Sequence, residues 1–511
     1  MGDKRIDFIL VLLLILVSIG LQAYFLNPPV ISDQLDYFFH ANSFFNKPLA
    51  ITHRSMRLGL IIPTAVLIKI FGYSEAAYYA MSFIGMAALV AGTYLIARYL
   101  FSRTTAILSA VLIMAMPNVL WESGHLLPDI PGAGIAVLAF GLLAAANPDG
   151  GKNNKRTAHW TNFGVGLLLG WAYLIREFVL FIFPMVIILL WIRRRPFSDL
   201  LLVMLGAVLM ASIEWVYCAY FYGNPFTRFI SVQPRGTAGS INRDIYQVVT
   251  YLPRLINKYN GHVYNLMLFL SLAVNCYQSL KGRKENLFLL IWFVSGFLLL
   301  TLTGLLPVIL DWPDTVLLRL HLFRYWMIIV PPLVIGGVTA LQDLLGFLTA
   351  KYLTAASGRK LLTGVITLLI TAIAIVQSYQ SLSNNKDTIK NGNDAYLEFR
   401  EYIINNTDPS DTLWIERGFP RASEWIILIY LKTFFGKSLW EGSIKYLNDG
   451  ITYPDISELH SGLIVTNKYF HNPRFFNYPE YLLNIPNNWS LKFYLSASRS
   501  DRGAYLIESF F

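Results

Sequence analysis

Residues 6–26 read IDFILVLLLILVSIGLQAYFL, an apolar run long enough to cross a bilayer as one helix. Two polar stretches follow it closely, SDQLDY at 32–37 and HRSMR at 53–57. Charged side chains beside a membrane are costly to keep there without a use, so this arrangement predicts a reaction at the membrane surface, on a substrate that is partly lipid. No small-residue cleavage site follows the first run, and we therefore interpret it as a retained span.

The composition also indicates a membrane protein. The 511 residues are 55% hydrophobic and only 14% charged, whereas a soluble domain carries about 25% charged residues. The net charge of +10 comes from basic residues in short loops between apolar runs. These residues form no continuous patch, so we exclude nucleic acid as a partner and expect membrane lipids instead.

Apolar runs of sufficient length predict eleven membrane spans. They lie at 6–26, 76–97, 104–120, 130–146, 161–175, 178–192, 199–221, 263–280, 286–306, 323–345 and 361–380. Basic residues gather in every second loop, which predicts a cytoplasmic N-terminus and an extracytoplasmic C-terminus. We expect an integral protein of the cell's inner (plasma) membrane.

The composition changes at about residue 383, where the polar linker SNNKDTIKNGND begins. The pattern beyond it predicts helices near 394–405 and 423–435, and strands at 412–416, 462–466 and 504–507. The expected fold is therefore mostly α, with a polytopic transmembrane domain at 1–382 and a small outward-facing α/β domain at 383–511.

The first acidic stretch predicts a short interfacial helix. Asp33 and Asp36 are three residues apart and share one face of such a helix. The following aromatic residues give the helix an apolar side that lies on the bilayer, namely Tyr37, Phe38, Phe39, Phe44 and Phe45. The simpler alternative is a solvated cap at a helix start.

Basic residues converge on the same outer face in this topology. Arg57, Arg176 and Arg324 can hold an anionic phosphate, for which guanidinium is well suited. The alternative is simple snorkelling to lipid headgroups. Further candidates at this face are His53, Glu177, His321 and Tyr325.

A short loop brings a third group of candidates to this face. Asp129 precedes a predicted span by one residue, and Glu122 and His125 lie just before it. Such a carboxylate–histidine group can hold a divalent cation, although its spacing fits no named metal motif. As a plain alternative, Asp129 caps the next helix.

Five stretches in this order resemble a known family. They are SDQLDYFFHA (32–41), HRSMRLGLIIPTAVLIKIFGYSEAAYYAMS (53–82), SGHLLPDIPGAGIAVLAF (123–140), WAYLIREFVLFIFP (171–184) and HLFRYWMIIVPPL (321–333). The chain resembles the polytopic C-type glycosyltransferases, which have the GT-C fold. This group includes protein O-mannosyltransferases and the aminoarabinose transferase acting on lipid A. The resemblance covers roughly residues 1–345. Where the family often has a second acid beside its first aspartate, this chain has Gln34, which leaves the family's metal site open.

The resemblance implies the chemistry. A sugar on a polyprenyl phosphate is the donor, and a hydroxyl of a lipid, glycan or protein attacks its anomeric carbon with inversion. Asp33 is then the general base, and Asp129 orients the acceptor or the base. Arg57, Arg176 and Arg324 bind the donor phosphate, with His321 secondary. No cofactor beyond a divalent metal is implied.

Two other classes remain open at this point. A transporter or flippase for a lipid-linked substrate predicts charges near the bilayer midplane, whereas these lie at one face. A non-catalytic membrane scaffold does not require convergent arginines and aspartates. The sugar and the acceptor are open as well.

Overall fold

The computed structural model describes residues 2–26, 29, 33–46, 48–49, 51–52, 54–146, 152–228, 262–309, 323–352, 357–358, 361–383, 412–415, 432, 444–446, 462–467, 489–494 and 504–509. They divide into two compact units. The first comprises residues 1–27, 44–63 and 80–382, and the second comprises 28–43, 64–79 and 383–511. Our division of the chain into domains 1–382 and 383–511 stays a prediction.

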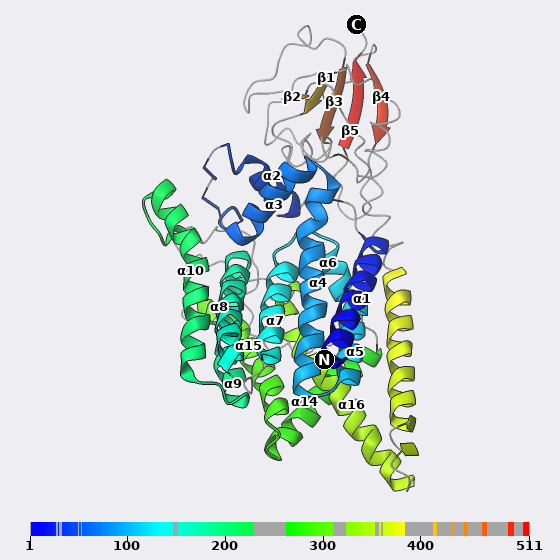
Figure 1. Ribbon diagram of the computed structural model, residues 1–511. Coiled ribbons are helices and arrows are strands. Elements are labelled where there is room, and N and C mark those ends of the chain that lie inside the picture. Colours follow the sequence, from blue (N-terminus) through cyan, green and yellow to red (C-terminus); the bar gives the residue numbers. More distant parts are fainter. Residues whose placement is uncertain are drawn as a thin grey trace. The chain divides into compact units, whose positions relative to one another are not determined.

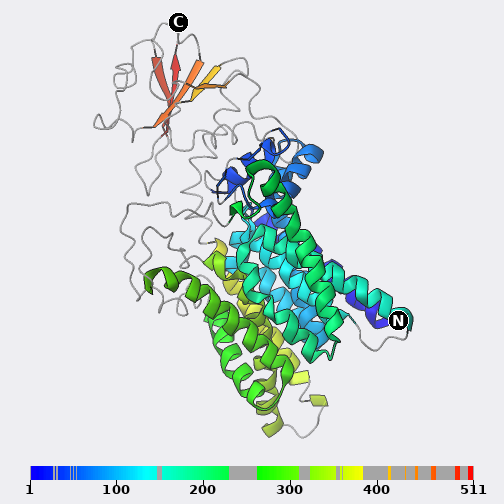
Figure 2. The ribbon, with the colours of Figure 1, turned by 90° about the vertical axis from the view of Figure 1, so that its left-hand side faces the viewer.

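The first unit is a helical bundle (Figure 1). Its elements, with α3 and α4 extending into the second unit, are α1 (Gly2–Tyr24), α3 (Leu58–Phe71), α4 (Glu75–Leu100), α5 (Arg103–Ala115), α6 (Pro117–Ser123), α7 (Asp129–Ala145), α8 (Lys152–Ile175), η1 (Glu177–Ile182), α9 (Pro184–Ile192), α10 (Phe197–Tyr222), α14 (His262–Leu280), α15 (Lys284–Ile309), η3 (Phe323–Ile329), α16 (Val330–Tyr352) and a helix at Leu361–Ser383. Figure 2 shows α14 and α15, in green, lying side by side.

Helices cover all the predicted spans, which confirms a polytopic α-helical membrane protein. Of the described helices, seven are long and apolar enough for a full crossing, or eight if the bent pair α5–α6 is one span. The other predicted spans fall on α7, α8 and η1–α9, and of these α7 and η1–α9 are apolar but shorter. Helix α7 has 17 residues and extends about 25 Å, less than the roughly 30 Å of a bilayer core.

Helix α7 is nevertheless the centre of the bundle, since almost all of its residues are buried. It packs closely on α4, because a side chain on Gly134 would overlap the backbone of Gly85. The preceding segment turns sharply, with α5 and α6 meeting at 61°. Pro117 begins α6 there, and a proline is accepted at a helix start but not in its interior. The turn directs the chain toward the N-terminus of α7.

Helices α1, α10 and α14 lie at the bundle surface and expose many large apolar side chains. Such an exposed apolar surface is expected where helices face lipid tails. Helix α1 is fixed at one point by a buried charge. Asp7 accepts hydrogen bonds from Tyr94, Arg98 and Arg103 at 2.8–3.0 Å. These partners compensate the cost of burying the carboxylate and thereby set the position of α1.

The second unit contains a five-stranded mixed sheet in the order β2-β1-β3-β5-β4. Its strands are β1 (Thr412–Ile415), β2 (Ile444–Tyr446), β3 (Gly462–Asn467), β4 (Trp489–Tyr494) and β5 (Ala504–Ser509). β1 pairs in parallel with β2 and β3, whereas β5 pairs antiparallel with β3 and β4. The three predicted strands are thus confirmed, and β2 and β4 are additional.

The two helices predicted for this region fall on residues that are not described, except for Lys432. Lys432 forms a β-bridge with Ser74 instead of lying in a helix. Its N–H donates to Tyr73 O at 3.0 Å, and its carbonyl accepts from Glu75 N at 2.9 Å. A backbone ladder contact here outweighed the local helical pattern at this position.

Candidate active site

Asp129 is the first residue of α7, and its carboxylate lies between two arginines. Its Oδ1 is 3.2 Å from Arg176 Nε, and its Oδ2 is 3.9 Å from Arg324 Nε. The Asp129 side chain is only 4% exposed. A buried carboxylate needs such compensation, and the α7 N-terminus adds a favourable dipole.

The local chain geometry positions Arg176 and Arg324 next to Asp129. Helix α8 ends at Ile175, and Arg176 takes an extended conformation that turns its side chain toward α7. Gly132 permits the approach, because a Cβ at this position would lie 2.9 Å from Arg176 Cβ. Arg324 comes from the 3-10 helix η3, which packs on α7.

Aromatic rings cover the same guanidinium groups. Arg176 lies 4.7 Å from the ring centre of Phe178 and 4.9 Å from that of Tyr325. Arg324 lies 5.3 Å from Tyr325. These cation–π contacts orient the arginines without neutralising their charge. The structure thus brings together four predicted site residues, Asp129, Arg176, Arg324 and Tyr325.

Glu122 and His125 lie next to this group, within electrostatic reach of Arg324. His125 is buried, and its Nδ1 is 3.0 Å from Trp121 O. Burial is the main cause that lowers the pKa of His125 to about 4, so its ring is neutral at pH 7. Within the described ranges, no three His, Cys, Asp or Glu side chains are placed to hold a metal ion. This geometry gives no support to a cation site at Glu122, His125 and Asp129, because Asp129 pairs with Arg176 and Arg324.

A second charged group lies around Glu177, the residue after Arg176. Glu177 Oε1 is 3.6 Å from Arg57 Nη2, and its Oε2 is 2.9 Å from Arg228 Nη2. Arg228 also donates to Glu214 Oε2 at 2.7 Å. Burial opposes ionisation of Glu177, but Arg57, Arg176 and Arg228 together lower its pKa well below the usual range. Glu177 is therefore an anion at neutral pH.

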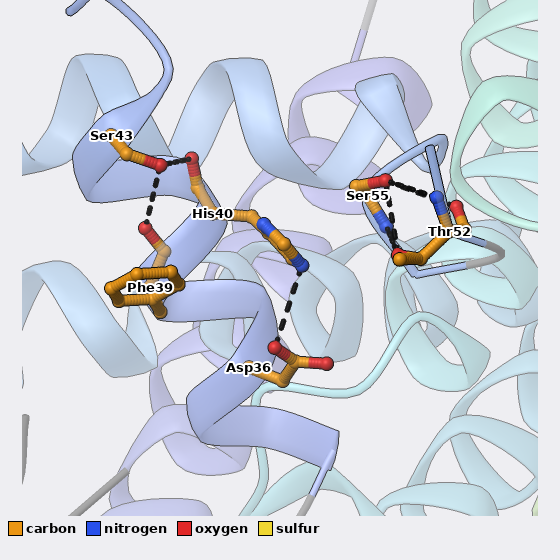
Figure 3. A network of polar contacts seen from close by, with 6 residues as sticks. All are labelled: Asp36, Phe39, His40, Ser43, Thr52 and Ser55. Atoms are coloured by element: carbon orange, nitrogen blue, oxygen red, sulfur yellow. Dashed lines mark hydrogen bonds and ion pairs between the residues drawn. The ribbon is translucent and has the colours of Figure 1, made fainter. Parts of the chain in front are cut away.

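Arg57 reaches this group because the chain around it packs on the end of α8. A Cβ on Gly59 would lie 2.6 Å from Ile175 N, so only glycine fits there. Trp171 Nε1 donates to Gly59 O at 2.8 Å. A turn just before Arg57 is held by hydrogen bonds between Thr52 and Ser55 (Figure 3).

Arg228 and Glu214 were missed by the sequence analysis, although a signal was present. Glu214 is an acid within the apolar helix α10, and Arg228 follows that helix by six residues. A carboxylate inside a membrane helix indicates a function and requires a partner. Arg228 is the nearest arginine beyond α10 in the sequence.

Asp33 and Asp36 lie in α2 (Asp33–Ser43), which belongs to the second unit. Asp36 Oδ1 is 3.4 Å from His40 Nε2 (Figure 3). Gln34 accepts a hydrogen bond from Tyr78 at 2.6 Å. The predicted approach of Asp33 to Asp129 joins residues of different units and stays a prediction.

The predicted apolar face of α2 needs a correction. Tyr37 and Phe38 are buried within the protein rather than turned to the bilayer, and Phe38 packs on the rings of Tyr73 and Tyr78. Phe39 and Phe45 are exposed, as expected. Two further candidates, His53 and His321, lie outside the described residues.

Comparison with known proteins gives a family match over part of the chain. Residues 62–217 match the family model of dolichyl-phosphate-mannose-protein mannosyltransferases. No match was found among curated protein sequences. The matched region includes the segments that carry Asp129 and Arg176.

Solved structures match over nearly the whole chain. ArnT from Cupriavidus metallidurans in the apo state is similar with a TM-score of 0.59 and 14% identity, over 97% of this chain and 97% of that chain. The same protein bound to undecaprenyl phosphate gives a TM-score of 0.57 and 12% identity, over 99% and 98%. The likeness to ArnT confirms the expected GT-C architecture. The chain is thus an integral membrane protein with the GT-C fold, and its residues 62–217 are similar to the mannosyltransferase family.

Proposed function

We propose that the chain transfers a sugar from a polyprenyl-phosphate donor to a hydroxyl of a lipid, glycan or protein. The observation that carries this proposal is the buried carboxylate of Asp129 between Arg176 and Arg324. One acid set among several cations suits a reaction that binds a hydroxyl and releases a phosphate anion. The mannosyltransferase match over residues 62–217 supports the same reaction class.

The reaction is a single displacement. The acceptor oxygen forms a bond to the anomeric carbon while the bond from that carbon to the phosphate oxygen breaks, so the configuration inverts. Asp33 takes the hydroxyl proton as general base. The lipid phosphate leaves as an anion, and no strong general acid is needed.

The arginines stabilise the charge that develops on this leaving group. A guanidinium presents a planar fork of donors that matches two phosphate oxygens at once. Arg57, Arg176 and Arg324 are the residues assigned to this role, and Tyr325 holds two of them by its ring. Asp129 orients the acceptor hydroxyl or the base. The neutral ring of His125 borders the site without adding charge.

Topology and location complete the proposal. The basic loops place the N-terminus in the cytoplasm and the C-terminal domain outside, in the inner (plasma) membrane. The active site then faces the outer leaflet, where the donor phosphate lies at headgroup depth. The C-terminal domain selects or steers the acceptor.

The test is a transfer assay with labelled sugar on a polyprenyl phosphate, cell-envelope membranes as acceptor and the purified full-length protein. We expect transfer by the wild type and its loss in Asp33→Asn, because an amide does not accept a proton as a carboxylate does. Asp36→Asn is the matched control, on the same helix and one turn away, and retains transfer. Loss in Asp36→Asn with retention in Asp33→Asn would reassign the base. A wild type without transfer refutes the proposal.

A further inference from the structure

Glu177 occupies the position between two arginines that an anion of similar size would fill. Its two oxygens contact different guanidinium groups, Oε1 with Arg57 at 3.6 Å and Oε2 with Arg228 at 2.9 Å. A phosphodiester also presents two unbridged oxygens and carries one negative charge. We propose that Glu177 is a displaceable placeholder, and that the donor phosphodiester replaces its carboxylate between Arg57 and Arg228, which adds Arg228 to the arginines assigned to this phosphate. This inference rests on the proposed function.

Exposure separates Glu177 from Asp129, the carboxylate that lies between Arg176 and Arg324. The Glu177 side chain is 35% exposed, whereas the Asp129 side chain is 4% exposed. A partly exposed carboxylate can turn into water and recover its hydration, but a buried one cannot leave without a large desolvation change. Glu177 is therefore the acid that can move aside.

Arg228 stays in place when Glu177 leaves. Its Nη1 is bonded to Glu214 Oε2 at 2.7 Å, and Glu214 is fully buried. The Tyr173 ring lies 5.1 Å from the guanidinium carbon. Neither contact is made by Glu177, so both still hold Arg228 when Glu177 moves aside.

Arg57 is held by the packing of its neighbours rather than by Glu177 alone. The close approach of Gly59 to the α8 backbone and the bond from Trp171 fix the chain two residues away. Both cations are thus preorganised, which limits the ordering cost of binding.

The charges also match a one-for-one exchange. Glu177 contributes one negative charge to the group that it forms with Arg57, Arg228 and Glu214. Exchange of its carboxylate for a phosphodiester leaves the charge of this group unchanged. The product is a phosphate monoester with a charge of about −1.5 to −2 at neutral pH, so it makes the group more negative. A returning Glu177 then favours release of the product.

The test measures binding of undecaprenyl methyl phosphate, a phosphodiester with one negative charge, to the purified full-length protein in lipid nanodiscs. Glu177→Gln removes the competing charge, and we expect its Kd to fall by about tenfold, which corresponds to one step of 1.4 kcal/mol. Asp343→Asn is the matched control, because Asp343 is 36% exposed and lies 3.4 Å from Arg283. Its Kd stays at the wild-type value.

Equal or weaker ligand binding by Glu177→Gln than by the wild type overturns the proposed placeholder role. Glu177 is then only a structural ion-pair partner of Arg57 and Arg228. A melting temperature checks that the variant is folded. If Glu177→Gln does not fold, Glu177→Asp is tested in its place. The shorter carboxylate of aspartate reaches the arginines less well, so the Kd of this variant should fall below the wild-type value. A rise in its Kd overturns the inference. A wild type that binds and transfers while Glu177→Gln binds no better leaves the proposed function intact. A wild type that neither binds nor transfers refutes both.

Discussion

Replacing Asp129 by asparagine removes the charge that lies between Arg176 and Arg324 while keeping the size of the side chain. The two guanidinium groups then remain buried or partly buried without their shared anion. Removing one partner of a buried ion pair costs about 3–5 kcal/mol. Glu177 lies within electrostatic reach of Arg176 and recovers part of this loss. We therefore expect Asp129→Asn to lower the free energy of unfolding by about 2–3 kcal/mol.

A double-mutant cycle isolates the interaction itself. Arg176→Met keeps an apolar stem under the rings of Phe178 and Tyr325 but removes the charge. The double variant Asp129→Asn/Arg176→Met should be more stable than the sum of the single losses predicts, with a coupling free energy of about 1.5–3 kcal/mol. The measurement is reversible unfolding of the purified protein in mixed micelles.

A second pair in the same chain calibrates the cycle. Arg283 and Asp343 lie 3.4 Å apart, but their side chains are 57% and 36% exposed. Water screens such a pair, and its coupling should be below about 1 kcal/mol. We infer that burial raises the coupling free energy between Asp129 and Arg176. Equal coupling free energies in the two pairs would refute this inference, and so would additive effects of the Asp129 and Arg176 variants.

Three further outcomes are expected. Arg324→Lys should lower transfer at least about tenfold, because lysine keeps the charge but loses the planar fork; full activity would return Arg324 to a snorkelling role. His125 has a folded pKa of about 4 against roughly 6.5 unfolded, so the unfolded state gains the proton first and stability is lost as the pH falls below 6.5. The melting temperature of His125→Gln should consequently fall less between pH 7 and pH 5 than that of the wild type. Identical slopes would contradict a buried neutral ring. Protease added outside spheroplasts should cleave within residues 383–511, and protection there would reverse the proposed orientation.

Sequence reasoning identified the central charged group because each member stands at the end of an apolar run. Asp129 precedes a span, Arg176 interrupts one and Arg324 begins one. When apolar runs pack in parallel, such end positions meet at one level, so a pattern along the chain becomes a group in space. Arg228 also follows an apolar run, but the polar sequence after it contains further arginines, so Arg228 does not stand out.

Packing details were less accessible to the sequence. The aromatic residues of α2 predicted a face on lipid, yet Phe38 is buried against Tyr73 and Tyr78. Hydrophobicity alone does not distinguish a lipid neighbour from a protein neighbour, since both are apolar. The same ambiguity affects the short helix α7, which is apolar and is buried in the bundle.

The most direct test of the central claim is a single-turnover experiment with a polyprenyl-phosphate donor that carries an isotope-labelled sugar. The purified protein is placed in vesicles with envelope lipids, glycans and proteins as acceptors. We expect labelled product and free lipid phosphate to appear in equal amounts, with the sugar in the inverted anomeric configuration by NMR. Labelled sugar that crosses the bilayer while still attached to its lipid, or a product with retained configuration, would show that the protein is not an inverting glycosyltransferase.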